Sequence, residues 1–253
     1  MKREDRKQAI MDLLVGQRMV DLDDLSERFS VSKMTIHRDL DDLEQAGMLR
    51  KVRGGATIEA GTQFESDFRF RERQEGDAKR RMAAAALDLV EPGMTVMIND
   101  GSMAAILGGM LPERRPLTVI TNNAAVIDRL RLEPGITLIA LGGIYSAKFN
   151  GFFGVVTETA LERLRADIAF ISTPALNGAL VFHMDDNVIR AKRAMMAAAE
   201  RKCLLVNHTR FNHSALHVLA RLDEFDVVIT DDAPPADARA AIDEIKVPLR
   251  VAS

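Results

Sequence analysis

The sequence predicts an α/β fold class in which a small N-terminal winged helix-turn-helix domain precedes an α/β domain with a mainly parallel sheet. Three observations predict it. The first sixty residues contain three short helical periods and a glycine-containing hairpin. Beyond them, six apolar runs alternate with helical segments, which is typical of a parallel sheet covered on both faces. The length of 253 residues fits two domains better than one.

The composition is that of an ordinary globular protein, with 47% apolar and 28% charged residues. No run reaches the roughly 18 apolar residues of a membrane span, and no signal-type apolar stretch follows the N-terminus. We therefore expect a cytoplasmic protein without a membrane partner. Cys203 is the only cysteine, so an intrachain disulfide is excluded and a buried strand residue is expected. The net charge of −3 argues against indiscriminate binding of nucleic acid.

Apolar spacing and capping residues predict the N-terminal helices. The first covers about residues 3–15, and the second begins after Asp21, whose carboxylate suits an N-cap. The third follows the short turn "SVS", takes Ser32 as its N-cap and ends at Gly47. Two helices joined by so short a turn predict a helix-turn-helix.

The third helix carries cations and polar groups in its leading half and acids in its trailing half. At 100° per residue, Ile36, Leu40 and Leu43 share the inward face. A recognition helix enters the major groove with its N-terminal residues first, and Asp41 and Asp42 would repel phosphates. We therefore expect only the leading turns to enter the groove. A solvated face on a protein that never touches DNA is the alternative interpretation.

A hairpin, or wing, is predicted for "MLRKVRGGATI", residues 48–58, with Gly54 and Gly55 in the turn and three cations at the tip. The cations of helix and wing would neutralise about three to five phosphates per protomer, giving a log–log salt slope of roughly −3 to −5 per half-site. The residues expected at a double-stranded DNA operator are Ser32, Lys33, Met34, Thr35, His37, Arg38, Arg50, Lys51 and Arg53.

A polar stretch containing Phe64, Phe68 and Phe70 separates the two domains. Three phenylalanines are unusual in a disordered linker, so we expect this arm to pack on its own or on a neighbouring subunit; a mobile connection is the alternative. The predicted domains are residues 1–58 for DNA binding, 59–76 for the linker arm, and 77–253 for effector sensing and oligomerisation.

The second domain is predicted from alternating runs. Its expected strands are "MTVMIN", "LTVIT", "ITLIAL", "DIAFIS", "CLLVN" and "DVVIT", and its helices include about 77–90, 103–110, 124–132, 157–164 and 187–200. In a parallel sheet, ligands bind at the carboxyl ends of the strands. The segment Asp100-Gly101-Ser102 follows the first strand and opens a helix, so its free N–H groups and hydroxyl could hold a phosphate. Such turns also need glycine and an N-cap for structural reasons alone.

Residues 6–57, above all "VSKMTIHRDLDDLEQAGMLRKVRGGA", resemble the N-terminal domain of the DeoR family of bacterial transcription regulators, whose usual pattern is VS-x-x-TIRRDL-x-x-LE-x-x-G-x-L-x-R-x-x-GGA. The resemblance implies sequence-specific DNA binding. His37 stands where the family usually has its first arginine. Since histidine cannot make the bidentate guanine contact of arginine, the operator sequence is expected to differ.

Residues 77–232 are similar to the DeoR-family effector domain, which has the ribose-5-phosphate isomerase/CoA-transferase type of fold and senses phosphorylated sugars. The matching pieces include "TVITNN", "LIALGG" and "FNGFFG". By this resemblance, Ser102 and nearby amides would hold a phosphate, while Asn122, Asn123 and Gly142 would line a sugar pocket. The effector residues so implied are Lys79, Asp100, Gly101, Ser102, Thr121, Asn122, Asn123, Gly142, Gly143, Asn207 and Arg210.

The sequence departs from that family pattern at several positions. Met103 replaces the usual threonine of the phosphate loop, and Asn177 replaces an aspartate. The family's Asp-x-Ser-Lys-Phe segment appears as residues 207–211, where Asn207 removes a carboxylate and Arg210 keeps a cation that can bind an anion bidentately. An anionic metabolite is therefore still expected, although its sugar can differ from the commoner effectors. A pocket that has lost ordinary sugar-phosphate affinity is the alternative.

Two other functions were compared with this one. A sugar-phosphate isomerase needs a carboxylate base, but Asn177 and Asn207 stand where acids would be wanted, and the pair Asp185 and Asp186 suits helix capping. A metal-responsive regulator would use His208, His213 and His217, of which the last two have i, i+4 spacing. We expect neither an enzyme nor a metal or cofactor site.

The predicted function is that of a transcriptional repressor of a carbohydrate-metabolism operon, released by a phosphorylated sugar or a related anionic metabolite. A homo-oligomer, dimer or tetramer, would place winged helices on repeated or inverted half-sites. An effector that prefers one conformation would change DNA affinity by linkage. Repression is the usual behaviour implied by the family resemblance, whereas the residues themselves do not define the sign of regulation.

Overall fold

The computed structural model describes residues 2–17, 19–45, 48–57, 68–73 and 75–252. The chain divides into two compact units, Met1–Gln74 and Glu75–Ser253. Gly47, the predicted end of the third helix, Ile58, the last residue of the predicted wing, and residues 59–67 and 74 of the predicted linker lie outside the described residues. The described part of that arm includes a short helix, α4 (Phe68–Arg73), in which Phe68 is buried.

Besides α4, the described part of the N-terminal unit contains three helices and a small antiparallel sheet of strand order β1-β3-β2. Capping is as predicted: Asp21 Oδ1 accepts from Asp23 N at 2.7 Å, and Ser32 Oγ accepts from Thr35 N at 3.2 Å. These caps begin the second and third helices, and Ser30, in the left-handed conformation with φ of +52°, ends the second helix at the short turn. The elements are α1 (Arg3–Gln17), β1 (Met19–Asp21), α2 (Leu22–Phe29), α3 (Lys33–Gln45), β2 (Arg50–Val52) and β3 (Gly55–Thr57).

The core of this unit lies where the three helices and the sheet meet. The predicted inward residues Ile36, Leu40 and Leu43 are at most 5% exposed and pack with Ile10 and Leu25. This cluster orients α3, because a helix with one apolar stripe can bury only that face. The predicted inward face of α3 is confirmed.

The wing differs from the prediction in its turn. Val52 pairs with Gly55, so the turn consists of Arg53 and Gly54, and Gly55 belongs to β3. A Cβ on Gly55 would lie 2.0 Å from Val20 O, which shows how closely strand β1 approaches. The local pattern gives no sign of β1. The prediction therefore assigned Gly55 to the turn and put Arg50 and Lys51 too close to the tip. Both cations lie in β2 instead.

The second unit contains a seven-stranded sheet of order β15-β14-β12-β9-β4-β5-β6, in which every pairing is parallel. The predicted parallel sheet is therefore confirmed, and six of its strands were predicted. The sheet places the carboxyl ends of neighbouring strands along one edge. Its strands are β4 (Thr95–Ile98), β5 (Leu117–Thr121), β6 (Ile136–Ala140), β9 (Ala166–Ser172), β12 (Ala199–Leu205), β14 (Val227–Thr230) and β15 (Leu249–Val251).

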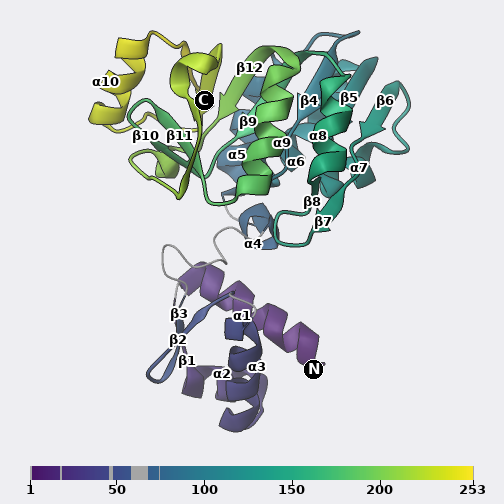
Figure 1. Ribbon diagram of the computed structural model, residues 1–253. Coiled ribbons are helices and arrows are strands. Elements are labelled where there is room, and N and C mark those ends of the chain that lie inside the picture. The colour runs from purple at the N-terminus through teal and green to yellow at the C-terminus, as the bar shows by residue number, and fades with distance from the viewer. Residues whose placement is uncertain (1, 18, 46–47, 58–67, 74, 253) are drawn as a thin grey trace. The chain divides into compact units, whose positions relative to one another are not determined.

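Helices cover both faces of this sheet. In Figure 1, α8 and α9 lie in front of the sheet, and α5 and α6 lie behind it. The short last strand and the helix before it, α10, were not predicted. The helices are α5 (Gly76–Leu87), α6 (Ser102–Met110), α7 (Ala124–Leu130), α8 (Val155–Glu162), α9 (Asp186–Ala197) and α10 (Ala236–Ile245). Within the part of the chain that the structure describes, no helix has the length and apolar character to cross a membrane.

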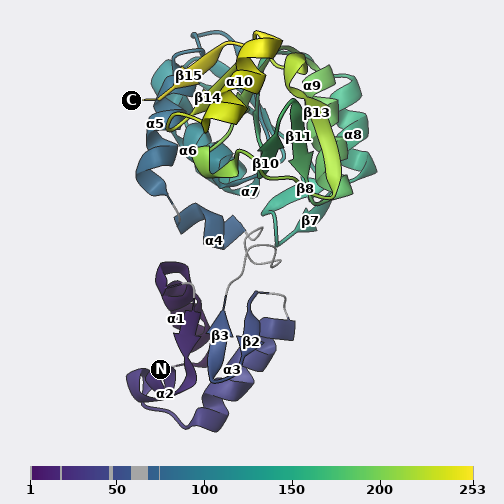
Figure 2. The same ribbon diagram turned by 90° about the vertical axis from the view of Figure 1, so that its left-hand side faces the viewer.

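Two smaller pieces of sheet complete this unit, and the sequence predicted neither. A three-stranded antiparallel sheet has the order β10-β11-β13, and a hairpin joins β7 to β8. Figure 2 shows β10, β11 and β13 beside the end of the large sheet that carries β14 and α10. Their bounds are β7 (Ile144–Ser146), β8 (Gly151–Phe153), β10 (Ala175–Asn177), β11 (Leu180–His183) and β13 (His217–Arg221).

The lone cysteine lies in the middle of the large sheet. Cys203 is completely buried in β12, as predicted for a small apolar residue. Burial disfavours its thiolate and raises the pKa of the thiol above the ordinary value. The thiol therefore stays protonated and has a packing role.

Candidate DNA-binding surface and effector site

The leading half of α3 is exposed on the side away from the core. Lys33, Met34, His37 and Arg38 are exposed, with Met34 at 62%, and Thr35 is half-buried. None of these side chains packs into the unit's own interior, so the residues predicted to contact DNA are accessible. Their roles at an operator stay predictions.

The acids of the trailing half of α3 are paired within the protein. Asp39 is 1% exposed and accepts from Arg6 Nε at 2.5 Å. Asp42 Oδ2 lies 2.6 Å from Arg3 Nη2 and 3.3 Å from Lys7 Nζ. Cations of α1 thus neutralise two of the acids that a groove-bound helix would otherwise bring towards phosphates.

The wing supplies the partner of a further acid. Lys51 Nζ lies 2.5 Å from Asp41 Oδ1, and Lys33 Nζ lies 2.6 Å from Asp23 Oδ1 on α2. Two of the predicted phosphate-binding cations are therefore already ion-paired. Arg38 and Arg53 are exposed and form no ion pair among the described residues. They are the cations most available to a polyanion.

The predicted phosphate loop lies at the carboxyl end of β4. Gly101, with φ of +107°, is the N-cap of α6, and Ser102 is its first residue. Asp100 and Ser102 are 1% and 3% exposed. The helix begins one residue earlier than predicted. The backbone N–H of Ser102 is therefore one of the free N–H groups in the first turn of α6.

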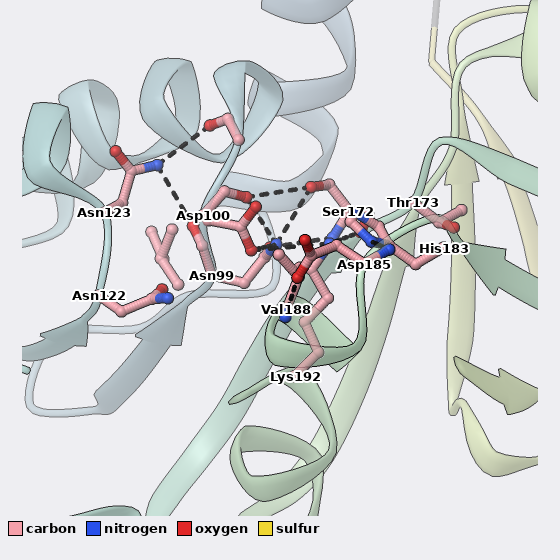
Figure 3. A network of polar contacts seen from close by, with 12 residues as sticks. Asn99, Asp100, Asn122, Asn123, Ser172, Thr173, His183, Asp185, Val188 and Lys192 are labelled. Carbon is pink, nitrogen blue, oxygen red and sulfur yellow. Dashed lines mark hydrogen bonds and ion pairs between the residues drawn. The ribbon is translucent and has the colours of Figure 1, made fainter. Parts of the chain in front are cut away.

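A polar network joins this loop to the neighbouring strand β9, as Figure 3 shows. Asn99 Oδ1 accepts from Ser172 N at 3.0 Å, and Asn99 Nδ2 donates to Asp100 O at 2.6 Å. Lys192 Nζ, from α9, donates to Ser172 O at 2.8 Å and lies 3.7 Å from Asp100 Oδ1. A lysine is therefore buried beside the aspartate of the predicted phosphate loop.

Sequence reasoning missed Asn99, Ser172 and Lys192. One signal could have found the lysine: Lys192 follows Val188 by four residues and precedes Met195 by three, so it lies on the buried stripe of its helix. A charged residue in such a stripe is rarely buried without a partner. The partner, Asp100, is 92 residues away in sequence and was not identifiable from spacing.

The end of β5 carries three more of the predicted effector residues, and all three are fully buried. Asn123 caps α7 and donates from Nδ2 to Gly101 O at 3.0 Å, and Thr121 Oγ1 donates to Ile98 O at 2.7 Å. These bonds tie the ends of β4 and β5 together. Asn122 Nδ2 donates to Phe152 O at 3.0 Å, but Asn122 Oδ1 has no partner in the described structure.

The β7–β8 hairpin packs against this end of β5. Phe152 N donates to Asn122 O and Ala124 N donates to Asn150 O, both at 2.9 Å. A Cβ on Gly151 would lie 3.0 Å from Asn122 O and 3.4 Å from the Asp100 side chain. Such close contact explains the glycine at this position, and it leaves the predicted sugar-lining asparagines covered.

The remaining predicted effector residues are more dispersed. Lys79 is buried on α5, whereas Gly142 and Gly143 are exposed after β6, where Thr157 Oγ1 donates to Gly142 O at 2.6 Å. Asn207 and Arg210 follow β12, which is two strands from β4, or roughly 10 Å. No hydrogen bond among the described residues joins them to the Asp100 network.

Asn207 and Arg210 flank a short 3₁₀ helix. Asn207 Oδ1 accepts from Thr209 N at 2.9 Å, so the residue caps that turn without the family's carboxylate. Its Nδ2 is buried and has no partner in the described structure. Arg210 is half-buried, and its guanidinium makes no hydrogen bond or ion pair within the described ranges. A bound anion could accept from both groups.

The three histidines weighed as metal ligands, His208, His213 and His217, have other surroundings. His208 Nδ1 lies 2.7 Å from Asp231 Oδ2, and His217 begins strand β13, so its spacing from His213 is not helical. Among the described residues, no group of three metal-ligating side chains was found. Asp185 caps α9 by accepting from Val188 N at 3.1 Å, which is the structural role expected for it.

Family models match both units. Residues 6–61 match the DeoR-like helix-turn-helix domain, and residues 74–232 match the DeoR C terminal sensor domain.

Three relatives cover nearly the whole chain. An uncharacterized HTH-type transcriptional regulator of Escherichia coli K12, YgbI, is 29% identical over 98% of this chain and 97% of its own. An L-fucose operon activator of Haemophilus influenzae is 30% identical over 91% and 92%. The glycerol-3-phosphate regulon repressor of Escherichia coli K12 is 25% identical over 99% and 100%. All three are named as regulators, which does not favour an enzymatic function.

Solved structures give a weaker likeness. A ribose 5-phosphate isomerase A from Methanocaldococcus jannaschii matches with a TM-score of 0.40 and 18% identity, covering 55% of each chain.

Proposed function

Because this chain belongs to the DeoR family of DNA-binding transcription regulators, we propose that it represses a carbohydrate-metabolism operon and releases its operator when it binds a phosphorylated sugar or a related anionic metabolite. Relatives named for the L-fucose operon and the glycerol-3-phosphate regulon support the class of target. One of them is named an activator and the other a repressor, so repression is the part of the proposal that rests on the family's usual behaviour.

The observation that carries the DNA-binding half of the proposal is the charge arrangement of α3. His37 and Arg38 are exposed on its leading half, while Asp39, Asp41 and Asp42 have internal cationic partners. A helix arranged in this way presents donors to base edges and phosphates without strong repulsion from its own acids. The other residues proposed to contact DNA surround these two on α3 and the wing.

The effector half of the proposal rests on the strand ends of the second unit. The N-terminal amides of α6 and the Ser102 hydroxyl suit a phosphate. Asn122 Oδ1 is covered by the β7–β8 hairpin, but it has no partner in the described structure and would suit a ligand hydroxyl that reached it. Arg210 adds an available cation two strands away. Helix amides and a guanidinium both favour an anionic group on a ligand that reaches them, which agrees with the proposed class.

Regulation would follow from linkage between the two sites. An effector that binds more tightly to the DNA-free conformation weakens operator binding by the same factor by which DNA weakens effector binding. We also propose that the protein acts as a dimer or a tetramer. When one recognition helix is bound, the linked second helix has a high effective concentration at its own half-site, so the pair binds more tightly than one helix alone.

Selection from a random duplex library with the full-length protein tests the DNA-binding half. The expected result is an enriched motif that repeats or inverts, bound with an affinity that falls steeply with salt. A final pool that is bound no better than the starting library would refute sequence-specific binding.

A thermal-shift screen of the full-length protein tests the effector half. Each phosphorylated sugar is compared with its unphosphorylated parent, and inorganic phosphate serves as the control for a simple anion effect. A stabiliser that requires both the sugar and the phosphate, and that releases the selected duplex in a gel-shift titration, is the expected result. Stabilisation by unphosphorylated sugars alone would contradict the proposed ligand class.

A further inference from the structure

The acidic half of the recognition helix holds the wing in place. Strand β2 lies at the edge of its sheet and pairs only with β3. Its outward N–H group at Lys51 donates to Glu44 Oε1 at 2.7 Å, and Lys51 Nζ lies 2.5 Å from Asp41 Oδ1. Two acids of α3 therefore bind one residue of β2: Glu44 binds the backbone of Lys51, and Asp41 binds its side chain.

The contacts of Lys51 with Asp41 and Glu44 connect the two segments that carry the most available cations, which are the leading half of α3 and the wing turn. Arg38 precedes Asp41 by three residues on α3, which is about one helical turn, and Arg53 follows Lys51 by two residues at the wing turn. Both arginines are exposed and without ion pairs in the described part of the chain. The contacts of Lys51 with Asp41 and Glu44 thus set the position of one guanidinium relative to the other.

We propose that Asp41 and Glu44 are positioning residues for DNA binding, which act by clamping the wing to α3 so that Arg53 meets the backbone of the duplex while Arg38 is in the groove. Lys51 serves this clamp with its ammonium group. The inference deepens the DNA-binding part of the proposed function and rests on it, but it does not depend on the effector.

The direction in which DNA affinity changes when Asp41 or Glu44 is neutralised distinguishes the clamp from a simple charge effect. Asp41 and Glu44 are acids on the helix that approaches a polyanion, so neutralising either one should strengthen DNA binding if charge alone matters. A clamp predicts the opposite, because its loss frees the wing and removes a phosphate contact. Pairs exposed to this degree are worth little to overall stability, so the variants should remain folded.

The test uses full-length Asp41→Asn and the double variant with Glu44→Gln, on the duplex selected by the wild type. Each is expected to bind that duplex ~3- to 10-fold more weakly, with a log–log salt slope smaller by about one, the change for one lost phosphate contact. Glu27→Gln is the charge-matched control, since it removes an exposed acid of α2 that is outside the clamp. Circular dichroism and thermal melting check the fold.

A double-mutant cycle shows whether Asp41 acts through the wing. Arg53→Ala should weaken binding in the wild-type background and have almost no further effect in Asp41→Asn, because the two changes remove the same contact. Lys51→Arg, which keeps a cation for Asp41, should bind nearly as well as the wild type.

Asp41→Asn binding that equals or exceeds that of the wild type, or additive effects of Asp41→Asn and Arg53→Ala, would overturn the clamp while leaving the proposed DNA-binding function in place. A wild-type protein that selects no motif would overturn both.

Discussion

Lys192 Nζ lies 3.7 Å from Asp100 Oδ1, and both side chains are 2% exposed. The lysine comes from α9, which covers one face of the sheet, and the aspartate follows β4. A charge buried to this extent is costly unless a partner and hydrogen bonds compensate for it, and Lys192 also donates to Ser172 O. The pair therefore connects a helix to the predicted phosphate loop through the interior of the unit.

Lys192→Met should lower the free energy of unfolding of the α/β unit by ~3–5 kcal/mol, since it leaves the Asp100 carboxylate buried without its cation. Urea unfolding followed by circular dichroism measures the loss. Arg114→Met, which breaks an exposed pair with Asp88, is the control and should change little. Similar losses in the two variants would show that the buried pair contributes no more to the free energy of unfolding than the exposed pair.

Arg38→Ala should weaken binding to the selected operator by about 1–3 kcal/mol, because an exposed arginine on the leading half of α3 can make bidentate contacts to guanine or phosphate. A gel-shift titration measures the change. Arg131→Ala removes an exposed arginine from the other unit and serves as the charge-matched control. Unchanged operator affinity in Arg38→Ala would rule out its proposed role, and the effector response should be the same in all three proteins.

His37→Arg restores the residue that the family pattern usually carries at this place. Histidine cannot contact both guanine acceptors, whereas arginine can, so the motif selected by the variant should gain a guanine at one position per half-site. Selection from the same random library with wild type and variant measures this. Identical motifs from the two proteins would show that residue 37 does not read a base.

Ser102→Ala and Arg210→Ala should abolish the thermal shift caused by the effector found in the screen, while operator binding stays intact. Ser102 begins α6. The Arg210 guanidinium has no hydrogen bond or ion pair among the described residues, so Arg210→Ala should not change the melting temperature of the free protein. Arg131→Ala again serves as the control for lost charge. A full effector response in either variant would remove that residue from the proposed site.

Glu224 accepts hydrogen bonds from β13 and from α9, and its ionisation makes the free energy of unfolding depend on pH. Burial opposes its ionisation, but hydrogen bonds from Arg221 N and from the Arg193 guanidinium outweigh burial and hold the pKa of Glu224 below its ordinary value. A lowered pKa in the folded state contributes stability above the unfolded pKa of about 4.3, and this contribution is lost as the pH falls through the folded value.

Glu224→Gln should therefore be less stable than the wild type at neutral pH, and the difference should shrink below about pH 4. Thermal melting of both proteins across that range measures it. A difference that stays constant with pH would show that the carboxylate's ionisation contributes nothing.

Local signals in the sequence predicted most of the secondary structure. Asp21 and Ser32 are N-caps because their side chains bond amides two or three residues away, a relationship that is visible in the sequence itself. The apolar periods of α3 and of the parallel strands are equally local. Short elements without such a period, including β1, the β7–β8 hairpin and β15, were missed because neighbouring strands define them.

The candidate sites were predictable only in part. The exposed face of α3 follows from helical geometry and its buried face, so Arg38 and His37 could be placed in advance. The wing residue Lys51 was placed near the tip, because the register of β2 on β3 depends on β1, which the sequence did not indicate. Asn99, Ser172 and Lys192 were not identified because their partners are distant along the chain.

The sequence by itself determined where helices and strands begin, which face of α3 is buried, and that the chain is a DeoR-type regulator, since these depend on neighbouring residues and on a long matching motif. Only the tertiary structure decided which charges are neutralised. Asp42 pairs with Arg3 across 39 positions, and Asp100 meets Lys192 across 92. Coulomb energy depends on distance in space and on burial, and neither quantity is encoded in separation along the chain.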